Sequence, residues 1–162
     1  MKIANCCSVL FVRDVKASKE FYCGLLGCVI DLDFGKNVIF RNGFATWEIQ
    51  DHHIIPGKLG RENISDTSVS RFELYFETED LDGANRHLQE HGVIFLHGIH
   101  EEPWGQRTIR FFDPDNHIIE IGESMKQFVK RFHDEGMTVA AIRQRTSVPE
   151  EEIQRLLGLE ST

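Results

Sequence analysis

The chain has 162 residues, of which 41% are hydrophobic, and a formal net charge of −8 at pH 7. This length allows one domain, or two half-domains that share a core, with enough buried apolar surface to fold alone. The excess of acidic residues argues against nucleic acid as the main partner, because the binding of phosphates needs clustered Lys and Arg.

The sequence shows no pattern typical of a membrane anchor or an export signal. Its N-terminus has no long apolar run followed by a small-residue cleavage site, and no stretch approaches the ~20 apolar residues of a membrane span. The four cysteines form neither a secreted disulfide framework nor a paired C-x-x-C zinc site. We therefore expect a soluble, cytoplasmic protein with reduced thiols and no membrane partner.

The hydrophobic pattern from Ala4 to Gln50 is repeated from Arg71 to Glu123. Each copy opens with an apolar strand, enters an amphipathic helix after an aspartate, and reaches a glycine before the next strand. Asp14 in the first copy corresponds to Asp80 in the second, an offset of 66 residues (80 − 14). This order predicts a strand, a helix and three strands in each half, which gives an α+β fold of two βαβββ modules with mostly antiparallel sheets.

The repeat also sets the expected domain boundaries. Residues 1–124 form the predicted two-module domain, with module one at 3–50, a polar linker at 51–70 and module two at 71–124. The hairpin between the last two strands is turned by Asp113-Pro114-Asp115-Asn116, in which proline fixes one backbone angle and asparagine tolerates a left-handed one. Residues 125–162 are expected to form a helical extension.

The helical extension starts after Ser124. A first helix is predicted from Met125 to Glu135, a second from Thr138, and a third from a capping box at Ser147–Glu150. The last two resemble a helix-turn-helix, which raises the question of DNA binding. The basic residues of the extension are balanced by acidic ones, so a packing or dimerisation role is favoured.

Two pairs of side chains stand at equivalent positions of the two copies. Cys7 corresponds to Glu73 at the same offset of 66 residues (73 − 7), and Glu48 corresponds to Glu120 near the end of each copy. Glu120 lies between apolar strand residues, where a carboxylate must be paired, hydrogen-bonded, metal-bound or neutral, because a bare buried charge is costly. We expect Glu48 and Glu120 to line one cavity; the alternative is that both form ordinary salt bridges on half-exposed strands.

Several motifs carry a resemblance to a known family. They are Val12-Arg13-Asp14, Phe21-Tyr22, Glu73-Leu74-Tyr75-Phe76-Glu77, Pro103-Trp104-Gly105-Gln106-Arg107 and, most specific, the run from Phe112 to Glu120. With these motifs, the chain from Ile3 to about Ser124 resembles the vicinal oxygen chelate superfamily, which includes glyoxalase I, extradiol dioxygenases, and bleomycin and fosfomycin resistance proteins. The resemblance implies two paired modules that curl into cups, and commonly a homodimer. In the metal-dependent members, ligands lie on the first and last strand of each module.

The resemblance implies that Glu48 and Glu120 match the two carboxylate ligands of a divalent metal ion, which would be Mn, Ni, Co, Zn or Mg. Cys7 and Glu73 stand where glyoxalase I and the dioxygenases usually have histidine. A set of three carboxylates and one thiol is unusual, because carboxylates suit hard cations and thiolates suit soft ones. The alternatives are that Cys7 is a small core residue and that Glu73 lines a pocket.

The implied activity is that of a small enzyme similar to glyoxalase I, a lyase or isomerase that acts on a small oxygenated substrate. In that chemistry a divalent ion binds adjacent substrate oxygens as a Lewis acid, and a carboxylate moves the proton. Glu48 and Glu120 are the predicted catalytic residues, with Glu120 as the base. An extradiol dioxygenase is disfavoured, because it needs two histidines and one carboxylate on Fe(II).

The competing hypothesis is a metal-free protein that sequesters a small molecule, as the resemblance to bleomycin resistance proteins implies. Aromatic side chains would then form walls around a planar or hydrophobic compound. The candidate contacts for a ligand or substrate are three aromatic residues and two arginines, namely Trp47, Tyr75, Trp104, Arg107 and Arg110. For Arg110, a structural ion pair with Glu73 or Glu48 is the safer interpretation.

Overall fold

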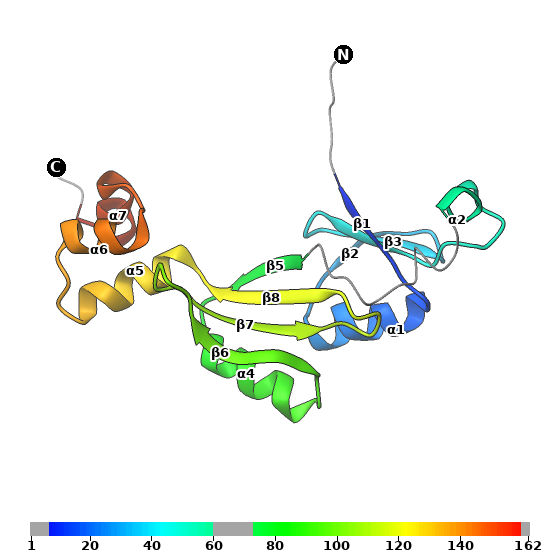
Figure 1. Ribbon diagram of the computed structural model, residues 1–162, viewed down its shortest axis with the longest axis horizontal. Coiled ribbons are helices and arrows are strands. Elements are labelled where there is room, and N and C mark those ends of the chain that lie inside the picture. The colour runs from blue at the N-terminus through cyan, green and yellow to red at the C-terminus, as the bar shows by residue number, and fades with distance from the viewer. Residues whose placement is uncertain (1–6, 60–72, 160–162) are drawn as a thin grey trace, which may run out of the picture. The chain divides into compact units, whose positions relative to one another are not determined.

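The computed structural model of the chain describes residues 7–59 and 73–159 (Figure 1). The chain divides into two compact units, the first comprising Met1–Phe72 and Asp113–His117 and the second comprising Glu73–Phe112 and Ile118–Thr162. Each unit holds one four-stranded mixed sheet, and the helical extension belongs to the second unit. The predicted α+β fold of two strand-helix-three-strand modules with a helical extension is confirmed, whereas the boundary placed at residue 124 stays a prediction.

The first unit follows the predicted order of elements. These are β1 (Ser8–Phe11), α1 (Val15–Lys19), η1 (Glu20–Leu25), β2 (Ile30–Asp33), β3 (Asn37–Phe40), β4 (Phe44–Trp47) and the short helix α2 (Ile54–Leu59). Asp14 begins α1, because its carboxylate accepts the backbone N–H of Lys16 at 2.8 Å. The helix widens to a π-helical turn in η1 and ends at Leu25, shortly before Gly27, whose φ of 68° favours glycine. In the sheet, β1 pairs in parallel with β4, and the strand order is β1-β4-β3-β2.

An aromatic cluster forms the core of the first unit around Tyr22, which is fully buried. The Tyr22 ring lies 5.6 Å from Phe40 and 5.0 Å from Phe44, and the rings of Phe40 and Phe44 stack at 4.6 Å. A buried hydroxyl needs a partner, and the Tyr22 hydroxyl donates to Oδ2 of Asp113 at 2.8 Å. Burial, reinforced by the negative charge of Asp113, raises the pKa of Tyr22, so this hydroxyl stays protonated.

Asp113 organises the turn Asp113–His117, which belongs to the first unit. Its carboxylate accepts the backbone N–H of Asp115 at 2.9 Å and that of His117 at 2.8 Å. Arg13 donates its backbone N–H to Oδ1 of Asp115 at 3.0 Å and its Nε to the same oxygen at 2.6 Å. The buried hydrogen bond from Tyr22 and the contacts of Arg13 thus hold the turn to the rest of this unit.

The second unit repeats the order of elements with longer strands. These are β5 (Glu73–Thr78), α4 (Leu81–Glu90), β6 (Phe95–Glu101), β7 (Arg107–Phe112) and β8 (Ile118–Glu123). The strand order is β5-β8-β7-β6, with β5 parallel to β8 and the other pairs antiparallel. One face of the sheet is apolar and packs on α4, and its buried residues are Ile109, Phe111, Ile119 and Ile121, with Leu81 and Leu88 on the helix. Since successive strand residues alternate between faces, polar side chains gather on the other one.

The extension forms three helices that follow β8, namely α5 (Met125–Asp134), α6 (Val139–Thr146) and α7 (Glu150–Leu157) (Figure 1). The hydroxyls of Ser124 and Thr138 cap the first two helices. The predicted capping box at Ser147 is wrong, because Ser147 takes a left-handed conformation that ends α6, and Pro149 precedes α7. Neither these helices nor any other within residues 7–59 and 73–159 are long and apolar enough to cross a membrane.

The variant Asp113→Ala is expected to lower the free energy of unfolding by roughly 2–4 kcal/mol, because the buried hydroxyl of Tyr22 and two backbone donors lose their acceptor. Urea unfolding of the variant and the wild type measures the change. The control is Asp31→Ala, at an exposed position of β2, which is expected to cost less than about 0.5 kcal/mol. Equal stability of the two variants would contradict a structural role for the Tyr22–Asp113 hydrogen bond.

Candidate functional site

Four side chains form a row across the polar face of the second sheet, here called the polar row. Tyr75 of β5 pairs with Glu120 of β8. Arg110 of β7 pairs with Glu120 on one side and with His97 of β6 on the other. Paired residues of neighbouring strands project to the same face, so these side chains are neighbours. Glu73, two residues before Tyr75, lies on this face as well.

The guanidinium of Arg110 is the centre of the polar row. Its Nε donates to Glu73 at 3.1 Å, and its Nη1 donates to Glu102 at 2.8 Å. Its Nη2 forms an ion pair with Oε2 of Glu120, and Nη1 also lies 3.2 Å from Nε2 of His97. Of the two partners predicted for an ion pair with Arg110, Glu73 is the one that pairs with it here, and two further carboxylates share the same guanidinium.

The carboxyl groups around Arg110 differ in their affinity for protons. Burial raises the pKa of Glu120, which is only 4% exposed. Arg110 opposes this rise, whereas the negative charges of Glu73 and Glu102 add to it. The hydrogen bond from Arg110 lowers the pKa of Glu102. Three carboxylates face one guanidinium, so negative charge is in excess. Because the pKa of Glu120 is raised, Glu120 is the carboxyl for which this excess favours the uptake of a proton or contact with a cation.

Gln106 lies between two exposed aromatic side chains, Tyr75 of the polar row and Trp104. Nε1 of Trp104 donates to Oε1 of Gln106 at 3.1 Å, and Nε2 of Gln106 donates to the hydroxyl of Tyr75 at 2.8 Å. Tyr75 is 47% exposed and Trp104 is 42% exposed, so both can meet a ligand from solvent. Burial of the hydroxyl end raises the pKa of Tyr75 to about 12, which keeps this group protonated. Hydrogen-bonded rings of this kind offer flat surfaces with fixed orientations.

Glu48, the other predicted catalytic carboxylate, has partners within the first unit. It follows β4 and forms an ion pair with Lys36. Its Oε2 accepts the backbone N–H of Val15 at 3.2 Å, at the start of α1. The hydrogen bond from Lys36 lowers the pKa of Glu48, so this carboxylate stays ionised over a wide pH range.

Trp47 and Cys7 also lie in the first unit. The ring of Trp47 lies 6.1 Å from Phe11 and 5.0 Å from His53. Cys7 is exposed, and its thiol donates to the carbonyl of Ser8 at 3.4 Å. The alternative that Cys7 is a small core residue is therefore wrong. The ligand-binding role of Trp47 and the metal-binding role of Cys7 stay predictions.

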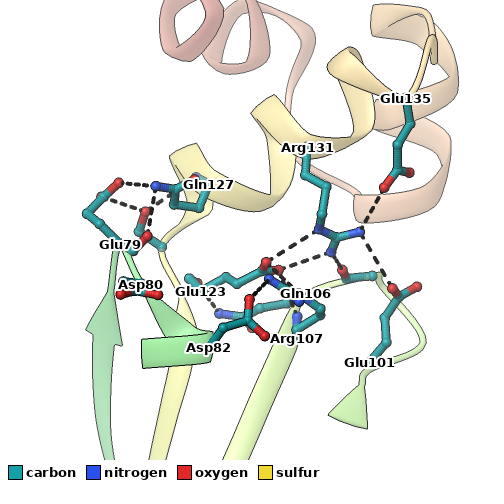
Figure 2. A network of polar contacts seen from close by, with 12 residues as sticks. Glu79, Asp80, Asp82, Glu101, Gln106, Arg107, Glu123, Gln127, Arg131 and Glu135 are labelled. Atoms are coloured by element: carbon teal, nitrogen blue, oxygen red, sulfur yellow. Dashed lines mark hydrogen bonds and ion pairs between the residues drawn. The ribbon is translucent and has the colours of Figure 1, made fainter. Parts of the chain in front are cut away.

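Arg107 lies on the opposite face of β7 from Arg110 and joins a second network of charged side chains (Figure 2). Its Nε donates to Glu123 at 2.7 Å, and its Nη2 donates to Asp82 at 3.3 Å. Burial alone would raise the pKa of Glu123, but hydrogen bonds from Arg131 and Arg107 hold it below its ordinary value. Arg107 thus has structural partners, and its contact with a ligand stays a prediction.

Each carboxylate of the predicted metal site has a cationic side chain as its partner. Glu73 and Glu120 share Arg110. Glu48 pairs with Lys36. A divalent ion needs direct contact with these oxygens, and Arg110 or Lys36 already occupies one oxygen of each carboxylate. Across the two described stretches, no group of three or more His, Cys, Asp and Glu side chains could hold a metal ion. The donor chemistry therefore does not fit a divalent ion.

Glu102 and Gln106 are site residues that sequence reasoning missed. Glu102 follows β6, whose register with β7 shifts twice, so strand alternation does not predict its direction. In the sequence, Gly122 could have indicated that another side chain approaches β8, because a glycine inside a strand often marks the close approach of another group. That side chain is Gln106. A Cβ at Gly122 would lie 2.7 Å from Nε2 of Gln106.

Comparisons with known proteins agree with this fold. The model of the family described as a glyoxalase-like domain matches residues 5–126, which covers both modules and leaves out most of α5 and all of α6 and α7. The protein YraH of Bacillus subtilis (strain 168), described as uncharacterized, is 32% identical over 120 residues, which is 69% of this chain and 91% of YraH. A crystal structure of a protein of unknown function from Agrobacterium tumefaciens is 39% identical with a TM-score of 0.59, covering 77% of this chain and 95% of that one. A lactoylglutathione lyase from Agrobacterium tumefaciens shares the fold at 21% identity with a TM-score of 0.56, covering 75% of this chain and 93% of that one.

The variant Arg110→Gln is expected to be destabilised by roughly 2–4 kcal/mol at about pH 8, because three carboxylates lose their shared counter-charge. The loss is expected to be smaller at about pH 5. Without Arg110 the pKa of Glu120 rises further above its ordinary value. Protonation of Glu120 then stabilises the folded protein at low pH. This contribution is lost as the pH rises through the raised pKa. Urea unfolding at the two pH values measures the difference.

The double variant Arg110→Gln/Glu120→Gln is the matched control, because it removes the carboxyl whose pKa is shifted. It is expected to recover part of the stability at about pH 8 and to depend less on pH than Arg110→Gln. The same pH dependence in both variants would show that Glu120 is not the group that responds to the loss of Arg110.

Proposed function

This chain belongs to the glyoxalase-like domain family, and from that membership we propose that it binds a small planar molecule at the polar row of its second unit, without a metal ion. The observation that carries the proposal is the Arg110 guanidinium, which Glu73, Glu102 and Glu120 share. A fixed cation thus meets Glu120, which the family resemblance matches to a carboxylate ligand of a metal, and Glu73, which stands at a position where the family usually has histidine. The homodimer and the cytoplasmic location expected from the sequence remain part of this proposal.

The charge balance of the polar row favours a neutral or cationic ligand. Three carboxylates surround one guanidinium, so an anionic ligand would add to the excess of negative charge. A cationic group beside Glu120 would favour the ionised form of that carboxyl, which burial disfavours. Tyr75, the strand neighbour of Glu120, offers a ring to the same cation.

The rings of Tyr75 and Trp104 supply the apolar surface for a flat molecule. Both are exposed enough to be contacted, and both are hydrogen-bonded to Gln106. Side chains that are already ordered lose less conformational entropy when a ligand binds, so more of the stacking energy appears as affinity. The ligand class that this geometry supports is a planar aromatic compound, neutral or positively charged.

A lyase or isomerase is the second candidate, because Glu120 combines burial with a raised pKa. A carboxyl of this kind is a candidate general base or acid, since proton transfer is most effective when the pKa of the group approaches the working pH. The lactoylglutathione lyase of the same fold is 21% identical, so that likeness concerns the fold alone. The glyoxalase-I-like reaction on a small oxygenated substrate through a divalent ion, which the sequence resemblance implies, belongs to this candidate.

We expect N-methylquinolinium, a planar aromatic cation, to bind at least about tenfold more tightly than naphthoate, a planar aromatic anion of similar size. Calorimetric titration in the presence of a chelator measures both affinities. Replacing Tyr75 with leucine is expected to weaken the binding of N-methylquinolinium about tenfold or more, because the ring supplies both a stacking surface and a cation–π contact.

Phe34→Leu is the matched control for the loss of an exposed aromatic ring. Phe34 is 67% exposed and belongs neither to the polar row nor to the loop with Trp104 and Gln106, so its replacement is expected to leave the affinity unchanged. Tighter binding of naphthoate than of N-methylquinolinium, or binding that a chelator abolishes, would count against the proposal.

Metal titration separates the two candidate functions. Calorimetric titration of chelator-treated protein with Mn²⁺, Ni²⁺, Co²⁺, Zn²⁺ and Mg²⁺ is expected to show no stoichiometric site, because oxygens of these carboxylates are already paired with Arg110 and Lys36. Stoichiometric binding that disappears in both Glu48→Gln and Glu120→Gln would instead favour the lyase or isomerase and justify assays with 2-oxoaldehyde adducts. Glu90→Gln, at an exposed position of α4, is the control for the loss of one carboxylate.

A further inference from the structure

The three helices of the extension have a hydrophobic core of their own. It consists of Phe128, Val129, Phe132, Ile142, Val148 and Ile153. Arg131 lies on α5 among the residues of this core, yet its side chain extends toward the end of β8 and the loop after β6 (Figure 2). The helices therefore stabilise one another by apolar packing, to which the polar contacts of Arg131 do not belong.

Arg131 holds the loop that joins β6 to β7. Its Nη2 donates to the carbonyl of Gly105 in this loop at 2.6 Å. The same nitrogen donates to Oε2 of Glu123 at 3.0 Å, and Nη1 lies 3.6 Å from Glu101 at the end of β6. The Arg131 side chain is 23% exposed, so these contacts are only partly screened by water. One guanidinium thus connects the helix to the loop and to the ends of two strands.

Gly105 seats the loop on the aromatic ring of Phe132. Its φ of 91° favours glycine, and a Cβ at this position would lie 2.2 Å from Cζ of Phe132. The guanidinium groups of Arg131 and Arg145 lie 4.7 and 4.4 Å from the centroid of the same ring. Backbone, ring and charge contacts therefore fix the position of Gly105 relative to the extension.

The loop that is held in this way carries side chains of the candidate site. Trp104 and Gln106 are the two neighbours of Gly105 in the chain. Gln106 donates to the hydroxyl of Tyr75 and, at 2.8 Å, to the backbone carbonyl of Glu123. A shift of Gly105 must therefore move the indole of Trp104 and the amide that orients Tyr75.

We propose that Arg131 is a positioning residue for the polar row, through which the C-terminal helices set the affinity of the protein for its ligand. Its hold on the loop stands on the contacts above, and its effect on affinity rests on the proposed function. When Arg131 is lost, the loop and the two rings become less ordered, and a ligand must order them as it binds. The extension then acts on the site without contacting the ligand.

The variant Arg131→Met tests this proposal with two readouts. In a Trp47→Phe background, which leaves Trp104 as the one tryptophan of the chain, acrylamide quenching of fluorescence is expected to rise about twofold because the loop is less ordered. In protein that retains Trp47, the affinity for N-methylquinolinium is expected to fall about tenfold. Gly105→Ala keeps Arg131 but forces the loop away from Phe132, and it is expected to produce both changes.

Lys130→Met is the matched control, because Lys130 is the neighbour of Arg131 and pairs with Asp134 on an exposed surface. It is expected to change neither readout. Unchanged quenching in both Arg131→Met and Gly105→Ala overturns the proposal, and so does increased quenching with an unchanged affinity. If wild-type protein fails to bind any planar probe, the proposed function is wrong, and the quenching result alone then decides whether Arg131 holds the loop.

Discussion

Arg110 supplies the positive charge that three acidic side chains of the second unit share. Glu120 and Glu102 are largely withdrawn from water, and buried carboxylates without a counter-charge would oppose folding. Because Arg110 lies on a central strand, it can reach Glu73 and Glu120 on β5 and β8 and Glu102 beyond β6. This one guanidinium lets the sheet keep a polar face while the other face packs on α4. The positions of the Tyr75 and Trp104 rings and of the Gln106 amide depend on the geometry of this polar face.

Two glycines allow other side chains to lie close to the backbone in this unit. Gly122 leaves space for Gln106 to cross β8, and Gly105 leaves space for the loop to rest on Phe132. A methyl group at either place would meet atoms closer than van der Waals contact allows. The candidate site and the extension are therefore connected at two glycines. Because glycine has no side chain, the chemistry of the residues alone does not reveal this connection.

Local patterns in the sequence were sufficient to predict the order of elements, because the hydrophobic periods of strands and helices can be recognised from neighbouring residues. The same reasoning showed that Glu120 needs a partner. It could not choose that partner, since an arginine and a metal ion can both satisfy a buried carboxylate. Glu102 lies beyond a strand with two register shifts, and the left-handed Ser147 ends a helix where a cap was expected. Those features depend on tertiary contacts rather than on local pattern.

The turn Asp113–His117 makes the first unit depend on residues made much later. The acceptor for the buried hydroxyl of Tyr22 lies 91 residues further along the chain. On the ribosome, the core around Tyr22 therefore cannot be completed until β5, α4, β6 and β7 have all been synthesised. A fragment that ended at the linker would keep the aromatic cluster but leave a buried donor without its acceptor. The two modules are translated one after the other, but the first can complete its fold only after most of the second has been synthesised.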